Sequence, residues 1–325
     1  MKLVRLFAAL AAVTLALGAF APDALAQGWP SKPVRIIVPF TPGSATDIIA
    51  RALAERLQPV LVQPLIVENR PGAGGTIGAA VVAQSPPDGH TLLVQSSGHT
   101  VNPHIYASLG YDTLRDFAGV TPLVTLPNVL IVAPSKGYKS LGELVAAAKA
   151  QPGALNYASA GTGSATHMNS EKFRAAAGIS AVHVPMKGTP EAITETIAGR
   201  VDWFFAPLIS AGPMIKDGKA IALAVGTSRR AALLPDVPTT VEAGVANSDY
   251  TFWIGLFAPA KTPREIVDKL QQEVVRVMAS TEMKKRLASL GAEAWTTTPA
   301  QFDDYVRAEL AANASIVGAA GIKPN

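Results

Sequence analysis

Four short turns rich in glycine, serine and threonine are the segments of this sequence best suited to chemistry: residues 39–47, 70–76, 96–98 and 159–167. Each follows a run of β-branched or aliphatic residues, and all but the third precede a helical pattern. A helix that starts after such a turn presents unpaired backbone N–H groups and a partial positive charge. Small residues let a ligand come close to these groups. The pattern therefore predicts non-covalent binding of a small anion, such as a carboxylate.

The candidate ligand-binding residues come from these turns and from two later strand ends. An alternative remains for each turn, because glycine-rich turns also make tight connections and serine or aspartate also caps helices without binding a ligand. Four such turns in one chain favour a binding site. The candidates are Phe40, Thr41, Gly43, Ser44, Ala45, Asp47, Gly74, Gly75, Ser96 and Ser97, followed by Ala160, Gly161, Thr162, Gly163, Ser164, Lys187 and Phe205.

Four of these candidates have a particular expected role. Phe40 is the best candidate for an aromatic wall, and Phe205, at a strand end, could also face the cleft. We expect Asp47 to tie its own loop together rather than act as a base, because no nucleophile lies near it in the sequence. Lys187 follows a strand and could attract an anion, although a solvated lysine is the alternative interpretation.

Catalytic and metal-binding signatures are missing. The sequence contains no Gly-x-Ser-x-Gly elbow, no Walker phosphate loop, no His-Glu-x-x-His motif and no Gly-x-Gly-x-x-Gly after a strand. Its five histidines lack metal-ligand spacing. One enzymatic alternative is an exported hydrolase with Ser164 as nucleophile and His167 as base, but no orienting third group or oxyanion motif accompanies them. We therefore expect no enzyme activity, no metal and no cofactor.

Composition and charge narrow the class of protein further. With 49% hydrophobic and 16% charged residues among 325, the chain is expected to fold, and its length suits two domains. The net charge of +4 is spread thinly, so no basic face for nucleic acid is expected. The lack of cysteine excludes disulfides, thiolate metal sites and cysteine nucleophiles, so stability must come from packing.

The N-terminus has the pattern of an export signal. Lys2 and Arg5 precede an apolar stretch at residues 6–20, and small residues at 24–26 suit a signal peptidase. A membrane anchor is the alternative, but the stretch is short for a spanning helix. We expect a signal peptide over residues 1–26, cleaved after Ala26, and a soluble periplasmic protein.

From residue 34 onward, short aliphatic runs alternate with longer amphipathic segments, the pattern of an α/β fold with mostly parallel sheets flanked by helices. Helices are predicted over residues 45–57, 76–83, 141–150, 164–177, 190–198, 263–279, 282–290 and 299–317. Strands are predicted over residues 34–40, 65–68, 91–95, 155–158, 181–184, 201–205, 221–225 and 252–258.

The chain is expected to cross between two domains twice. Pro122 and Pro127 interrupt apolar runs that indicate a crossing, and residues 252–258 suit the return. Parallel sheets bind ligands beyond the carboxyl ends of their strands, so the four turns should meet in the cleft between the domains. The predicted domains are residues 27–127 plus 252–325, and residues 128–251, with hinges near residues 126–129 and 250–253.

A further set of motifs runs along the chain in a fixed order. They are Trp29-Pro30-Ser31-Lys32-Pro33-Val34-Arg35, Val38-Pro39-Phe40 with Pro42-Gly43 and Asp47, Val67-Glu68-Asn69-Arg70-Pro71-Gly72-Ala73-Gly74-Gly75, Gly161-Thr162-Gly163-Ser164 with His167, His183-Val184-Pro185-Met186-Lys187-Gly188, Gly199-Arg200-Val201-Asp202 and Leu234-Pro235-Asp236-Val237-Pro238-Thr239. Together they resemble the Bug family of tripartite tricarboxylate transporter substrate-binding proteins, over essentially the whole mature chain.

The resemblance implies a two-domain, hinged periplasmic binding protein of the type II fold. Such a protein closes on a small carboxylated solute and delivers it to the membrane permease subunits of its transporter. The family's loops that match residues 40–47 and 160–164 hold one carboxylate, partly through ordered waters. We also expect a monomer with no cofactor and no nucleic-acid partner.

Two departures from the family pattern bear on the ligand. The family usually has Gly-Gly where this chain has Gly43-Ser44, and an aromatic residue where it has Met186. An aliphatic di- or tricarboxylate and an aromatic carboxylate both remain open as ligands. An exported sensory module that binds a carboxylate is a further alternative function.

Overall fold

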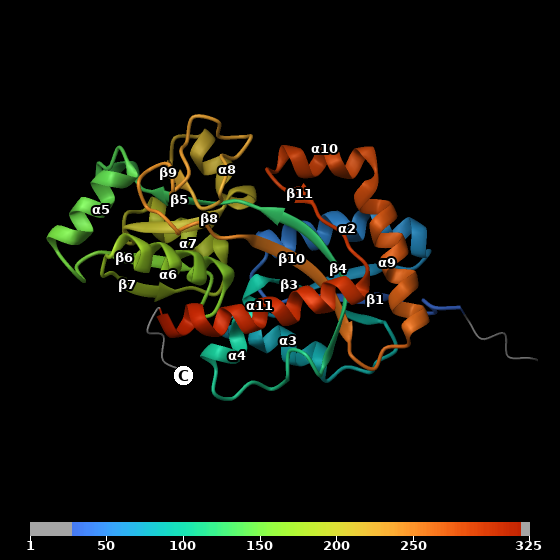
Figure 1. Ribbon diagram of the computed structural model, residues 1–325. Helices are drawn as coiled ribbons and strands as arrows, with labels where there is room; N and C mark the ends of the chain where they lie inside the picture. Colours follow the sequence, from blue (N-terminus) through green and yellow to red (C-terminus); the bar gives the residue numbers. More distant parts are fainter. Residues whose placement is uncertain (1–27, 320–325) are drawn as a thin grey trace, which may run out of the picture.

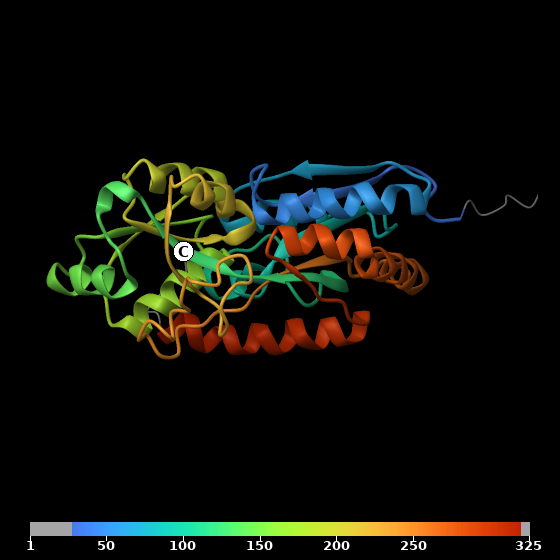
Figure 2. The same ribbon diagram turned by 90° about the horizontal axis from the view of Figure 1, so that it is seen from above.

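The computed structural model describes residues 28–319, which form two lobes around two β-sheets (Figure 1). The expected signal peptide and its cleavage after Ala26 lie outside the described residues. We call residues 28–126 and 252–319 the first lobe, and residues 128–251 the second lobe. The lobes lie side by side in both views, with the second lobe in green and yellow on the left (Figures 1 and 2).

The first lobe contains a six-stranded sheet in the order β11-β4-β10-β3-β1-β2. Its strands β1, β2 and β3 are parallel, whereas β10 is antiparallel to both β3 and β4, and β11 is antiparallel to β4. The bounds are β1 Val34–Val38, β2 Leu65–Asn69, β3 Thr91–Ser96, β4 Phe117–Leu126, β10 Phe252–Pro259 and β11 Glu293–Ala294.

Helices cover both faces of this sheet. Successive residues of a strand point to opposite faces, so Ile36 packs with one layer of helices and Ile37 with the other. The first layer holds α2, α9 and α10, and the second holds α3 and α11, which lie below the strands in Figure 1. The bounds are α2 Ala45–Leu61, α3 Thr76–Ala83, α4 Asn102–Ile105, α9 Arg264–Ala279, α10 Thr281–Ser289 and α11 Pro299–Ala319.

The second lobe contains a five-stranded sheet in the order β7-β6-β8-β5-β9, again covered on both faces. Helices α5 and α6 pack on one face, and α7 and α8 on the other. Strands β6, β7 and β8 are parallel, and β5 is antiparallel to β8 and β9. The bounds are β5 Asn128–Val132, β6 Asn156–Ser159, β7 Val182–Pro185, β8 Trp203–Pro207, β9 Ile221–Val225, α5 Leu141–Ala150, α6 Ala165–Ala177, α7 Thr189–Ile197 and α8 Leu208–Lys216.

The chain passes from one sheet to the other at two places. β4 ends at Leu126 and β5 begins at Asn128, so Pro127 alone separates the two sheets, and the chain returns to the first lobe at Phe252. The α/β class is confirmed, but the sheets are more mixed than expected. Strands joined through helices run parallel, because the helix brings the chain back, whereas β4, β5 and β10 pass directly between the sheets and pair antiparallel.

Helices α4 and α8 were not predicted from the sequence. Helix α8 contains Gly212 and Pro213, and both residues disfavour a helix interior. Packing of Leu208 and Ala211 in the core beside α7 compensates for this low propensity. Within residues 28–319, no helix combines the length and the apolar character needed to cross a membrane.

Candidate ligand-binding site

Two helices, one from each lobe, begin where the lobes meet. Residues 39–44 lead from β1 into α2, and residues 160–164 lead from β6 into α6. Ser44 and Ser164 are the N-cap residues, and both have the extended backbone that N-caps adopt, with ψ of 156° and 159°. The matching turns therefore bring two helix N-termini to one place.

A small cavity of ≈ 20 Å³ lies between these helix starts. By volume it holds about one water molecule, so it has room for a single small polar group rather than a whole dicarboxylate. All of its lining residues are buried, so the cavity is closed to solvent in this arrangement of the lobes. The lining residues are Phe40, Ser44, Ala45, Thr46, Ser96 and Phe252 from the first lobe, and Ala160, Ser164, Ala165, Thr166, Thr189 and Pro207 from the second.

The lining offers hydrogen-bond donors and no charged side chain. First-turn residues of α2 and α6 line the cavity, α7 begins at the lining residue Thr189, and α8 begins directly after Pro207. Aligned peptide dipoles place about half a positive charge at each helix N-terminus. Thr46 Oγ1 is buried without a hydrogen-bond partner. The arrangement therefore suits an anion that is held by backbone and hydroxyl donors.

Hydrogen bonds join the two lobes around the cavity. The Ser44 hydroxyl accepts from Thr189 N at 3.1 Å and makes no capping bond within α2. The Ser44 side chain thus ties the lobes together and leaves the first-turn N–H groups of α2 without a side-chain cap. The other bonds run from Thr41 Oγ1 to Glu191 Oε2 at 2.9 Å, from Ser210 Oγ to Gly43 O at 3.3 Å and from Tyr106 OH to Thr162 O at 2.9 Å.

The backbones of the lobes approach most closely at Gly74. A Cβ atom there would lie 1.9 Å from Thr162 O, and Gly74 has φ of +59°. Across the interface, a Cβ on Gly161 would lie 3.1 Å from Gly74 N. Close contact and left-handed backbone both require glycine. The second glycine-rich turn therefore serves the fit between the lobes rather than the cavity wall.

Asp47 holds the first turn in shape. Gly43 N donates to Oδ2 at 3.0 Å, Arg51 Nε contacts both carboxylate oxygens at 3.0 Å, and Asn69 Nδ2 donates to Oδ1 at 2.9 Å. Burial acts to raise the pKa of Asp47, but the hydrogen bonds from Arg51, Gly43 and Asn69 outweigh it and hold the pKa below its usual value. The ionised side chain thus ties its own loop together.

The substitution Asp47→Asn is expected to destabilise the protein at neutral pH and to matter little in acid. Because the folded pKa is lowered, the ionised carboxylate contributes stability above the unfolded pKa of about 3.9, and this contribution is lost as the pH falls through the lower folded value. In urea unfolding, the free energy of unfolding of the natural protein should exceed that of Asp47→Asn by about 1–3 kcal/mol at pH 7. This difference should be smaller at pH 3. An equal advantage at both pH values would contradict this.

In the second lobe, Ser164 caps α6, and the His167 ring does not act on it. His167 N donates to Ser164 Oγ at 3.3 Å, while the ring atom Nδ1 of His167 accepts from Gly163 N at 3.2 Å. The imidazole therefore faces the loop backbone. A hydrolase with Ser164 as nucleophile and His167 as base would need a hydrogen bond between the imidazole and the Ser164 hydroxyl. The described hydrogen bonds of the two side chains do not include one.

The substitution Ser164→Ala is expected to weaken carboxylate binding about tenfold and to cost about 1 kcal/mol of stability, because it removes a cavity hydroxyl and a helix cap. Ser140 provides a matched control, since its Oγ caps α5 by accepting from Glu143 N at 3.2 Å, far from the cavity in sequence and fold. Calorimetric titration and thermal melting of both variants separate the two effects. Equal affinity in Ser164→Ala and Ser140→Ala would rule out a ligand contact.

The structure brings most of the predicted site residues to the junction of the lobes. Those that line the cavity are Phe40, Ser44, Ala45, Ser96, Ala160 and Ser164. Those that form the loops beside it are Thr41, Gly43, Asp47, Gly74, Gly161, Thr162 and Gly163.

Four predicted residues belong neither to the lining nor to the loops beside it. Gly75 packs behind Phe40, and Ser97 Oγ contacts Tyr250 OH at 3.1 Å within the strand crossing. Lys187 is exposed, so its attraction of an anion stays a prediction. The expectation that Phe205 faces the cleft is wrong: it is fully buried in the second lobe.

Phe205 was misplaced because both faces of β8 are covered. Trp203 and Phe205 point to the α5 and α6 side, and Phe204 points to the α7 and α8 side. Phe205 packs edge-on against Phe173, with ring centroids 5.4 Å apart. All three aromatic residues are buried, so hydrophobicity gave no indication of which one would reach the cleft.

Sequence reasoning missed several lining residues. Thr46, Ala165 and Thr166 could have been found, because they occupy the first turns of helices whose caps were already candidates. The remaining ones lie at the start of α7, the end of β8 and the start of β10, which only the fold brings to the junction. They are Thr189, Pro207 and Phe252.

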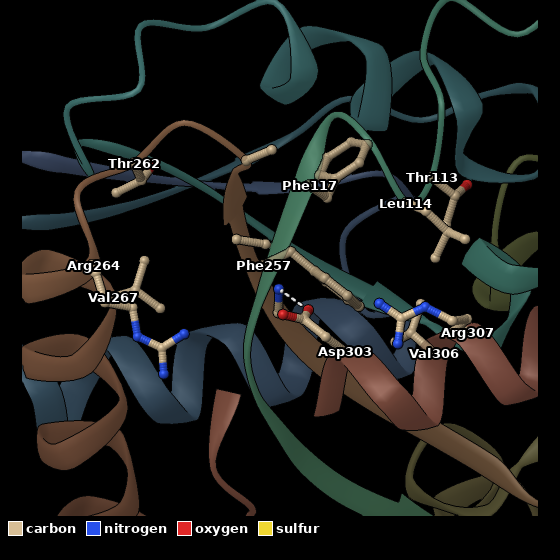
Figure 3. A pocket seen from close by; sticks show the side chains of 13 residues that line it. Thr113, Leu114, Phe117, Phe257, Thr262, Arg264, Val267, Asp303, Val306 and Arg307 are labelled. Atoms are coloured by element: carbon tan, nitrogen blue, oxygen red, sulfur yellow. Dashed lines mark hydrogen bonds between the residues drawn. The ribbon is translucent and has the colours of Figure 1, made fainter. Parts of the chain in front are cut away.

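A larger cavity of ≈ 400 Å³ lies within the first lobe (Figure 3). Asp303 points at the backbone there and accepts from Gly119 N at 2.7 Å, with Arg264 and Arg307 on either side. Each arginine is paired with an aspartate of its own helix. The second lobe contributes nothing to this lining, so lobe closure cannot act on a ligand here. No cluster of three His, Asp or Glu within residues 28–319 could hold a metal ion.

Known proteins match this chain over most of its length. Residues 49–322 match the family described as tripartite tricarboxylate transporter family receptor. Protein BugT of Bordetella pertussis is 33% identical over 325 residues, 99% of each chain. The structure of R. palustris Rpa4515 with adipate has a TM-score of 0.88 and 33% identity, covering 91% of this chain and 100% of that one. MatC of Rhodopseudomonas palustris with bound malate has a TM-score of 0.84 and 32% identity, covering 89% and 100%.

These relatives settle the class of protein. The family members and structural neighbours are solute-binding proteins of the periplasm rather than enzymes. The Bug resemblance seen in the sequence motifs is thereby confirmed. The chain belongs to the tripartite tricarboxylate transporter receptor family and is a periplasmic solute-binding protein with that family's two-sheet α/β fold.

Proposed function

We propose that this protein captures a small carboxylated solute between its lobes and delivers it to the permease of a tripartite tricarboxylate-type transporter. The observation that carries the proposal is the cavity at the starts of α2 and α6. Helix N-termini and hydroxyl groups meet there from both lobes, and no carboxylate side chain opposes an anion. One carboxylate of the solute occupies this cavity.

The solute closes the protein around itself. Residues 27–127 with 252–325 form one domain and residues 128–251 the other, hinged near residues 126–129 and 250–253. The buried lining supports this movement, because a ligand cannot reach it without separation of the lobes. A ligand that contacts both lobes favours the closed form, because those contacts exist only there.

The solute is an aliphatic dicarboxylate. Two relatives support this class, since their structures contain adipate and malate. The small, uncharged lining supports recognition of one carboxylate at a time, so the second carboxylate extends toward the mouth of the cleft. A dissociation constant near 1 μM, about −8 kcal/mol, is within reach of a few hydrogen bonds to a desolvated carboxylate together with apolar contact.

The protein is exported with cleavage after Ala26 and acts as a monomer. Intact mass of the protein recovered from the periplasm should correspond to a chain that starts at Gln27. Size-exclusion chromatography with light scattering should give a single subunit. A mass that retains residues 1–26 would instead support the membrane-anchor alternative.

Calorimetry and thermal melting with adipate, malate and their diamides test the binding function. Micromolar binding at 1 mM ligand should stabilise the protein by about 4 kcal/mol, because only the folded state binds. The neutral diamides should give no shift, and the diacids should be recovered unchanged. Stabilisation by the diamides would contradict anion recognition, and consumption of a diacid would favour the enzymatic alternative.

Delivery to the permease needs a separate test. Cells that express the cognate permease should accumulate labelled dicarboxylate only when this protein is present in the periplasm. Binding without uptake in such cells would instead favour a sensory module.

A further inference from the structure

Two histidines with no contact to the cavity lie behind the loop at residues 160–164. His167 is in the first turn of α6 and His183 is in β7, and their rings stack with centroids 4.0 Å apart. His183 stacks in turn on Tyr157 at 5.0 Å, and Tyr157 stacks on Trp203 at 4.7 Å. The stacked column restricts the orientation of both imidazoles.

The column reaches the loop through two backbone amides. Gly163 N donates to Nδ1 of His167 at 3.2 Å. Gly161 N donates to Ser159 Oγ at 3.0 Å, and this hydroxyl lies 2.6 Å from Nε2 of His183. Both amides are therefore engaged behind the loop. Their partners fix the stretch of backbone that ends in the lining residue Ser164.

We propose that His167 is a positioning residue of the ligand site: its neutral imidazole accepts from Gly163 and thereby sets the shape of the loop that receives the carboxylate. The inference rests on the proposed function. The inference goes beyond that function, because it assigns a role to a side chain that does not line the cavity.

The contact requires the neutral ring. A protonated Nδ1 is a donor and would face the donating N–H of Gly163, so the hydrogen bond would be lost. Burial, followed by the nearby charge of Arg174, lowers the pKa of His167 to about 4. The Gly163 contact is therefore intact at pH 7.

Other ionisable groups surround the column. Burial, followed by the proximity of His167, lowers the pKa of His183 to about 3, and the Glu171 carboxylate opposes this shift. Tyr157 OH donates to Glu171, which Arg174 also contacts. Neighbouring rings so close together cannot both take a proton readily. Protonation of His167 therefore disfavours protonation of His183.

Two substitutions of His167 test the inference at pH 7. Asparagine places Oδ1 where the imidazole has Nδ1, so His167→Asn should keep the acceptor and bind adipate within about threefold of the natural protein. Leucine has no acceptor, so His167→Leu should bind adipate about tenfold more weakly. Equal affinity in the two variants, whether high or low, would overturn the inference. Unfolding by urea establishes that both variants are folded.

A pH profile adds a readout that a purely structural role would not move. The readout is the ratio of two dissociation constants for adipate, that of the natural protein divided by that of His167→Asn. This ratio should rise about twofold between pH 7 and pH 4, because half of the His167 side chains are protonated at pH 4. Protonation of adipate affects both proteins alike and cancels in this ratio. A constant ratio would overturn the inference.

The natural protein alone provides a further arm if His167→Leu does not fold. Saturating adipate should lower the pKa of His167, because the loop that binds the ligand favours the neutral imidazole as acceptor. NMR of the His167 ring measures this pKa. An unchanged pKa would overturn the inference. If the natural protein does not bind adipate at all, the proposal of adipate as a ligand is wrong. If it binds adipate but any of the contrary results above is obtained, only the positioning role of His167 is refuted.

Discussion

Replacement of Gly74 by alanine is expected to lower the affinity for a dicarboxylate such as adipate by at least about a hundredfold, or about 2.7 kcal/mol. The new Cβ would lie 1.9 Å from Thr162 O and 3.0 Å from its carbonyl carbon, both backbone atoms of the opposite lobe. Neither can move aside as a side chain would. The lobes must therefore stay further apart, and the cavity between α2 and α6 is not completed.

Gly178→Ala is a matched control for this effect. Gly178 has φ of +61°, close to the +59° of Gly74, but a Cβ there meets nothing within 4 Å. Both variants carry the left-handed strain of about 1–2 kcal/mol, and only Gly74→Ala adds the clash between lobes. Calorimetry should find unchanged affinity in Gly178→Ala. Normal affinity in Gly74→Ala would contradict the role of lobe closure.

The substitution Thr46→Asp is expected to abolish carboxylate binding. Thr46 lies in the first turn of α2 and lines the cavity, so an aspartate there would place a negative charge where the solute carboxylate is expected. Two such charges about 4 Å apart repel by about 4 kcal/mol at an effective dielectric constant near 20.

Thr46→Asn separates charge from shape in this experiment. Asparagine has nearly the volume of aspartate without its charge, so it should weaken adipate binding by no more than about tenfold, against more than a hundredfold for aspartate. Titration calorimetry and melting temperature provide the two readouts. Equal losses in the two variants would show that size rather than charge limits binding, which would contradict an anion site.

The sequence predicted individual elements better than their surroundings. Helix α5 and strand β9 have the predicted bounds, because a serine cap and a clear apolar pattern define the first and an aliphatic run defines the second. Helix α8 was missed, since Gly212 and Pro213 conceal a segment that tertiary packing makes helical. Local signals thus predict local structure, and contacts with the rest of the fold override them where they are weak.

The candidate site was predictable where its residues sit at helix starts. Ser44 and Ser164 follow glycine, precede a helix and reach the cavity, as the turn pattern indicated. Phe252 and Pro207 reach it through the return of β10 and the end of β8, which no spacing in the sequence reveals. Phe205 shows the converse limit, because a strand covered on both faces hides which side each residue takes.

Comparison of the first-lobe cavity with the cavity at the helix starts shows why volume alone does not identify a site here. The larger one lies in the first lobe beside Asp303 and is lined by that lobe only (Figure 3). The smaller one collects residues from both lobes and the starts of α2 and α6. A receptor that must hold and then release its solute benefits from the second arrangement, since separation of the lobes breaks half of the contacts at once.

A crystal structure of the protein grown with adipate would show where the solute binds. One carboxylate is expected between the starts of α2 and α6, within hydrogen-bond distance of backbone or hydroxyl groups of Thr46 and Thr166, and in contact with both lobes. Adipate bound only in the first-lobe cavity beside Asp303, or on one lobe alone, would contradict binding between the lobes.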